Sequence, residues 1–127
     1  MRPLILIAAA TIIASCSRPV APPGASLAQE TAGRAAGSPQ SCVSTIPSAQ
    51  SVRIIDSQTL AYGWGRTVYI NHLSAPCPGL QPLSTVIVQA GSGGMFCRGD
   101  RVRGREMGAI ISGPVCILNE WVPYRKQ

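Results

Sequence analysis

Cysteine is the residue type whose spacing in this sequence most directly suggests chemistry. The 127-residue chain holds five cysteines, and they lie in two different surroundings. Cys16 follows an apolar run near the start of the chain, directly after two small residues. The other four lie beyond residue 41, at Cys42, Cys77, Cys97 and Cys116. The two groups therefore need separate interpretations.

The first fifteen residues have the composition of a signal peptide. Met1 and Arg2 give a positively charged start, and residues 4–13 are an uncharged, largely apolar run. About ten apolar residues are too few to cross a bilayer core of about 30 Å, so the run predicts a signal sequence. The alternatives to a lipid-modified product are a soluble secreted protein, in which Cys16 has no special role, and an uncleaved anchor.

The sequence Ile13-Ala14-Ser15-Cys16 resembles the lipobox of bacterial lipoproteins. The resemblance implies diacylglycerol transfer to the Cys16 sulfur, cleavage before Cys16, and N-acylation of the new terminus. Two or three acyl chains hold a protein on a membrane firmly, whereas a single chain holds it only marginally. Ser17, where aspartate would retain a Gram-negative lipoprotein, implies sorting to the outer membrane. We therefore expect a lipid-anchored protein of the cell envelope, on the periplasmic face of the outer membrane.

The remaining four cysteines predict two disulfides, because an even number in a small exported domain is typical of a disulfide framework. Four cysteines allow three pairings. We favour the nested one, Cys77–Cys97 with Cys42–Cys116, which would tie the ends of the domain together. A metal site built from these cysteines and His72 is the alternative, but the sequence has no Cys-x-x-Cys or His-x₃-His spacing. We expect neither a metal nor a cofactor.

The other residues capable of acid–base chemistry form no recognisable set. His72 is the only histidine, and no motif pairs it with a serine or cysteine nucleophile. We expect it to be a partly buried residue at the end of a strand. The acidic residues beyond residue 50 are too scattered to nominate a carboxylate pair. They are Asp56, Asp100, Glu106 and Glu120. We therefore expect no enzymatic activity.

Arginines alternate with small or apolar residues in one short segment. In a strand, Arg101, Arg103 and Arg105 would share one face, with Val102 and Gly104 pointing inward. Such a face suits anionic groups such as lipid headgroups or cell-wall carboxylates, which arginine binds bidentately. A solvated face that discourages edge aggregation is the alternative. The net charge is +6 with only 13% charged residues, which fits mild attraction to anionic surfaces, and nucleic acid is not an expected partner.

The two tryptophans are candidates for partner contact. Trp64 lies between Gly63 and Gly65 at an expected turn, and Trp121 lies near the end of the chain. Exposed tryptophans often anchor interfaces, whereas packing is the alternative in a chain this poor in aromatic residues. Trp64 is the stronger candidate, because a Gly-Trp-Gly turn tip tends to stay exposed.

The elements that would position these residues begin after a polar segment. Residues 16–41 contain four prolines and three glycines and few large apolar residues. Such a segment cannot bury enough surface to offset its ordering entropy. We expect a lipidated, flexible tether over residues 16–41 and a small β domain over residues 42–127.

Short β-branched runs separated by turn residues predict an all-β domain. We expect a small disulfide-stapled barrel or sandwich of about six to seven short strands, with room for one short helix near residues 80–86. A core this small is marginal, so the disulfides would matter for folding. The candidate strand segments are residues 52–55, 59–62, 67–71, 84–89, 95–97, 101–103, 109–111 and 115–118.

Two blocks of this domain, residues 77–80 (Cys-Pro-Gly-Leu) and 97–100 (Cys-Arg-Gly-Asp), are its most distinctive features. Together with residues 53–56, 68–73 and 122–124, they resemble a family of small bacterial lipoproteins whose C-terminal domain has no assigned function. The resemblance covers about residues 42–124. It implies export, lipidation and a small cysteine-bridged domain, and it carries no active residues to transfer.

The sequence thus predicts an envelope-anchored lipoprotein that acts as a non-enzymatic binding or structural module. Its expected partners are the membrane, through the lipid anchor, and an envelope protein or an anionic envelope component. The alternative is a periplasmic inhibitor or accessory factor that presents residues 63–66 to one envelope enzyme.

Overall fold

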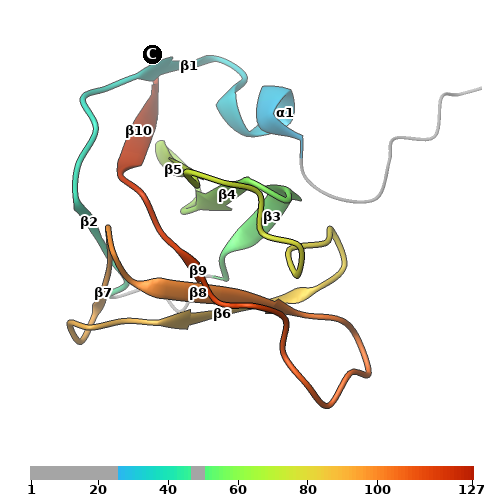
Figure 1. The fold of residues 1–127 in the computed structure, drawn as a ribbon. Helices are drawn as coiled ribbons and strands as arrows, with labels where there is room; N and C mark the ends of the chain where they lie inside the picture. Colours follow the sequence, from blue (N-terminus) through green and yellow to red (C-terminus); the bar gives the residue numbers. More distant parts are fainter. Residues whose placement is uncertain (1–25, 47–50) are drawn as a thin grey trace, which may run out of the picture.

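The structure is a computed structural model that describes residues 26–46 and 51–127, and it confirms the all-β fold. Within these ranges, ten strands form three antiparallel sheets and one short helix precedes them. The sheets stack in a sandwich-like arrangement and do not close into a barrel (Figure 1). The expected signal peptide, residues 1–15, and the expected lipidation site Cys16 lie outside the described residues.

The largest sheet has five strands in the order β1-β10-β5-β4-β3. These strands are β1 (Arg34–Ala36), β3 (Arg53–Asp56), β4 (Thr59–Tyr62), β5 (Thr67–His72) and β10 (Trp121–Lys126). Local turn chemistry makes β3, β4 and β5 consecutive hairpins. The Asp56 carboxylate accepts the Gln58 N–H at 2.8 Å, and Gly63 adopts φ 92° in the next turn, a conformation that glycine adopts without strain.

Two smaller sheets complete the fold. One pairs β2 (Cys42–Ser44) with β7 (Met95–Cys97), and the other has the order β6-β8-β9, made of β6 (Thr85–Gln89), β8 (Arg101–Arg105) and β9 (Cys116–Ile117). In the view of Figure 1 the β6-β8-β9 sheet lies below the five-stranded sheet. The inner faces of the two sheets supply the main core.

The main core is centred on Trp121, which is fully buried. Tyr62 packs edge-on against Trp121 and against Phe96, with ring centroids 6.2 and 5.5 Å away. A second, smaller cluster of Ala61, Val68 and Ile70 lies apart from it. The other buried members of the main core are Val43, Ile54, Leu60, Leu73, Cys77, Leu80, Val102 and Leu118. Trp121 is therefore a packing residue and not a partner contact.

Part of the expected tether belongs to the folded domain, so the prediction is wrong for residues 26–41. The helix α1 (Leu27–Thr31) begins with a capping box between Ser26 and Gln29, and β1 pairs with β10 along its full length. Glu30 also forms an ion pair with Arg53 at 2.7 Å. The prediction rests on apolar side chains alone, whereas backbone pairing to β10 and a capped helix need very few of them.

Further differences concern secondary structure. β2 and β10 are not among the segments expected to be strands. β10 contains Pro123, which is unusual inside a sheet, yet it pairs with both β1 and β5. Residues 109–111 form no strand. The helix expected near residues 80–86 is also absent, because residues 82–84, which include Pro82, form a turn and β6 begins at Thr85. The short helix lies at α1 instead. The remaining candidate segments coincide with β3 to β9 to within two residues at their ends.

The four cysteines form two disulfides, as expected, but the favoured pairing is wrong. The bridges join Cys42 to Cys97 and Cys77 to Cys116, so the two loops interleave and are not nested. Cys42 and Cys97 lie directly opposite each other in the β2–β7 pair, with Cα atoms 4.0 Å apart. Strand register decides the pairing, and cysteine spacing alone does not reveal the register.

Candidate functional site

The outer face of β8 carries the arginines, as the alternation predicts. Val102 is fully buried and Gly104 is buried, whereas Arg101 and Arg105 are exposed and Arg103 is half-buried. The alternation arises because successive side chains of a strand point to opposite faces of the sheet. Val102 faces the main core, so the arginines must face away from it.

No acidic residue lies opposite these arginines in the neighbouring strands. Across β6 the partners of Arg105, Arg103 and Arg101 are Thr85, Ile87 and Gln89. On the other side, Ile117 of β9 lies opposite Arg101. Among the described residues, the ion pairs are those of Arg53 with Glu30 and of Arg98 with Glu120, and neither involves this face. We call Arg101, Arg103 and Arg105 with their neighbours Ile87 and Ile117 the arginine face.

Three glycines, Gly79, Gly104 and Gly113, lie in close contact where β8 ends and the next loop begins. A Cβ atom on Gly104 would overlap the carbonyl group of Gly79, and one on Gly113 would lie 3.0 Å from the Gly79 Cα and 3.1 Å from the Gly104 oxygen. The Gly113 N–H donates to that same oxygen at 2.7 Å. The segment after Cys77 therefore crosses β8 and the returning chain at backbone contact distance, which only glycine allows.

Beyond this crossing, residues 106–115 form the loop between β8 and β9, which we call the β8–β9 loop. It projects beyond the sheets at the lower right of Figure 1. Met107, Ile110 and Ile111 are 81%, 96% and 83% exposed. The sequence-based prediction misses this loop because the apolar residues 109–111 favour a strand. The flanking Gly108 and Gly113 are the signal that favours a loop.

A pocket of about 480 Å³ lies beside the base of this loop. It adjoins the Cys77–Cys116 disulfide, and most of its lining is apolar. The lining residues are Leu73, Ser74, Ala75, Pro76, Pro78, Pro114, Val115, Cys116 and Ile117. It contains no ionisable side chain, so it offers apolar contact and no acid–base or ion-binding chemistry.

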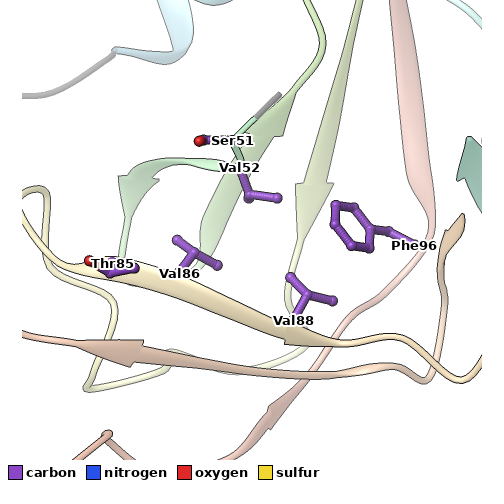
Figure 2. Close-up of a pocket in the computed structure, with 6 residues that line it drawn as sticks. All are labelled: Ser51, Val52, Thr85, Val86, Val88 and Phe96. Carbon is purple, nitrogen blue, oxygen red and sulfur yellow. The ribbon is translucent and has the colours of Figure 1, made fainter. Parts of the chain in front are cut away.

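A second pocket, of about 340 Å³, opens at the edge of the main core. Figure 2 shows Val86 and Val88 of β6 facing Val52 across it, with Phe96 at one end. These four side chains also pack against the core cluster. Ser51 lines the pocket and directly follows residues 47–50, which lie outside the described part of the chain. This pocket therefore belongs to the edge of the core and is not a candidate binding site.

Trp64 is 63% exposed, in keeping with its expected place at a turn tip. Its ring lies against the Arg53 guanidinium, with the Arg53 Cζ 4.2 Å from the ring centroid. Arg53 is itself held by two hydrogen bonds to the Glu30 carboxylate, at 2.7 and 2.8 Å, and by one to the Gly63 carbonyl at 2.9 Å. Trp64 is thus presented to solvent on a fixed cationic support.

His72 ends β5, but it is exposed and not partly buried. Its Nδ1 lies 3.2 Å from the Thr59 hydroxyl, and it lines neither pocket. Asp100 is nearly buried, and its carboxylate accepts the N–H groups of Gly91 and Cys97 at 3.0 and 2.7 Å. Its hydrogen-bonding capacity is therefore used to hold a turn.

The described ranges contain no group of three or more metal-ligating side chains. All four cysteines of the domain are in disulfides. None of the helical structure in residues 26–46 and 51–127 is long and apolar enough to cross a membrane.

No protein-family model, curated protein or solved structure matches the chain. The resemblance to small bacterial lipoproteins therefore stays a prediction. What the geometry offers is a cationic sheet face, an adjoining apolar loop and a separate exposed tryptophan.

Proposed function

We propose that this protein is an envelope-anchored lipoprotein whose β domain is a non-enzymatic module that binds an anionic envelope component. Acylation at Cys16 holds it on the periplasmic face of the outer membrane. The arginine face supplies the contact with phosphate or carboxylate groups.

The observation that carries the proposal is that none of the described residues opposite the arginine face on β6 and β9 is acidic. Three guanidinium groups share one sheet face, and their cross-strand partners on β6 are uncharged. By contrast, Arg53 and Arg98 have carboxylate partners within the fold. A guanidinium without an internal partner keeps its donors available for a bidentate anion.

The test is salt-dependent binding to isolated envelopes. We expect Arg101→Glu with Arg105→Glu to weaken binding, because both side chains are exposed and repulsion would replace attraction. Arg66→Glu with Arg125→Glu is the matched control, since both residues are exposed on other strands and turns. Equal binding by the two double variants would contradict the proposal. Mass spectrometry of the membrane-extracted protein should show an acylated N-terminal cysteine at position 16, and an unmodified precursor would contradict the anchor.

The second candidate function is that of an inhibitor or accessory factor for an envelope enzyme, and the exposure of Trp64 favours it. A tryptophan held rigidly at a turn loses little side-chain entropy on binding, which is a common property of interface anchors. We expect Trp64→Ala to abolish capture of one partner in a cross-linking pull-down. Ile46→Ala, at another exposed apolar position, should leave capture unchanged. Capture that survives in Trp64→Ala would exclude this loop.

A further inference from the structure

We propose that the β8–β9 loop is a membrane-contact loop. Its tip places Ile110 and Ile111 at the boundary between headgroups and acyl chains of the anionic bilayer to which Cys16 anchors the chain. The inference rests on the proposed function and adds to it the kind of surface that is bound and the orientation of the domain on that surface.

The composition and exposure of the tip favour a lipid partner. Residues 107–111 carry no charged or hydrogen-bonding side chain, and the three large ones are more than four-fifths exposed. A cluster of this kind beside cationic residues is a common mark of a membrane or protein contact. The tip has no aromatic or hydrogen-bonding group of the kind that dominates protein interfaces. It therefore suits acyl chains better than a protein surface.

The base of the loop is fixed, so the tip is presented in one orientation. Gly113 donates to Gly104 at 2.7 Å, and the Ala109 N–H donates to the Glu106 carbonyl at 3.0 Å. Backbone groups without partners cannot enter the hydrocarbon region without a large cost. The loop therefore inserts shallowly, with its side chains at the acyl boundary and its backbone among the headgroups.

The strand geometry then ranks the arginines by distance from the membrane. With a rise of about 3.3 Å per residue, Arg103 lies about 7 Å and Arg101 about 13 Å further along β8 than Arg105. The headgroup layer is about 5–8 Å thick on each side. In the proposed orientation β8 runs along the membrane normal, so Arg105 lies among the phosphates, Arg103 at their edge and Arg101 beyond them. Glu106, at the start of the loop, opposes the contact.

The length of chain before the domain also favours the membrane as the partner. Nine residues lie between Cys16 and Ser26, the first residue the structure describes, and the ten Cα–Cα steps reach at most about 36 Å when fully extended. A domain of about 100 residues has a radius of gyration of about 13 Å. An acylated Cys16 therefore keeps the domain within about its own diameter of the bilayer.

The test uses the acylated full-length protein reconstituted in phosphatidylglycerol vesicles whose acyl chains are brominated. We expect the added tryptophan of Ile110→Trp to be quenched by bromine, and that of Ile46→Trp, an exposed apolar position on the β2 side, to be unaffected. A tryptophan at position 110 that stays unquenched while the protein floats with the vesicles would overturn the inference. Blue-shifted emission without quenching would overturn it too, because the loop would then be covered by a second copy or by another protein.

Charge variants in the Ile110→Trp background measure the orientation. Arg105→Ala should lower the ratio of docked to undocked protein about fivefold, and Glu106→Gln should raise it about fivefold. Arg101→Ala should change it by about twofold or less, because Arg101 lies farthest from the phosphates and salt screens its charge most. Equal losses for Arg105→Ala and Arg101→Ala would mean that the sheet lies flat on the membrane, which contradicts the inference. Acylation and flotation are read separately, so a failed anchor is distinguishable from a failed loop.

Discussion

Replacing Gly104 with alanine should destabilise the protein more than any other single methyl addition in the domain. The added Cβ would overlap the carbonyl group of Gly79, which belongs to the backbone and cannot rotate away. Relief requires β8 to move away from the segment after Cys77, and that segment is tied to β9 by the Cys77–Cys116 disulfide. Relief of the clash therefore requires movement of the backbone, which has a large cost in free energy.

The magnitude follows from the distances at three glycines. Overpacking by one methyl group usually costs about 1–3 kcal/mol, and a backbone clash this close should cost about 3–5 kcal/mol. Gly113→Ala meets backbone atoms at 3.0 and 3.1 Å and should cost about 1–2 kcal/mol. Gly93 has no atom within 4 Å of the added methyl group and a backbone that alanine can adopt. Gly93→Ala should be neutral or stabilising by about 0.5 kcal/mol.

Thermal unfolding of the oxidised protein, followed by circular dichroism, measures this series. For a domain of this size about 1 kcal/mol corresponds to about 4–8 °C, so Gly104→Ala should lower Tm by at least about 12 °C. The expected order of Tm, from highest to lowest, is Gly93→Ala, then Gly113→Ala, then Gly104→Ala. A Gly104→Ala protein that unfolds within about 3 °C of the Gly93→Ala protein would refute the reasoning. In that case β8 and the segment after Cys77 could not lie at backbone contact distance.

Two further predictions concern the cross-links of the domain. Peptide mapping of the oxidised protein should recover the Cys77–Cys116 bridge, and recovery of the nested pairing would contradict the fold. The double variant Cys77→Ser with Cys116→Ser should lower the free energy of unfolding by about 4 kcal/mol in the chain-entropy model, measured by denaturant unfolding. Glu30→Gln should cost about 1–2 kcal/mol and speed amide exchange in α1 and β1, because the lost ion pair is largely buried. Glu120→Gln, from an exposed ion pair, should change neither quantity, and equal effects would show that α1 is not held by this contact.

The central strands are predictable because their side chains carry the two-residue period. In β5, Val68 and Ile70 face one way, and in β8 the arginines alternate with buried positions. This local pattern survives in any register, so it predicts strands and exposed faces well. For the same reason, the amino-acid sequence alone is enough to predict the arginine face of the candidate site.

The features that sequence does not predict depend on contacts between distant segments. β10 contains Pro123, and only its position between β1 and β5 shows that a strand forms there. β1 consists of Arg34 and two alanines, so its stability comes from the backbone of β10 and not from its own side chains. The disulfide pairing is mispredicted for the same reason, since it follows from β2 meeting β7.

The apolar stretch at residues 109–111 shows how hydrophobicity alone misplaces a segment. A strand needs a free edge to join, and β8 is already paired with β6 on one side and β9 on the other. Ile110 and Ile111 therefore cannot pair with β8, the strand that they follow in the chain. Single exposed apolar residues are common. Three on one loop form a cluster of apolar surface that is unusual for a small domain. Their exposure is what the proposed contact with a membrane requires, and the adjoining Arg105 fits the anionic surface of that proposal.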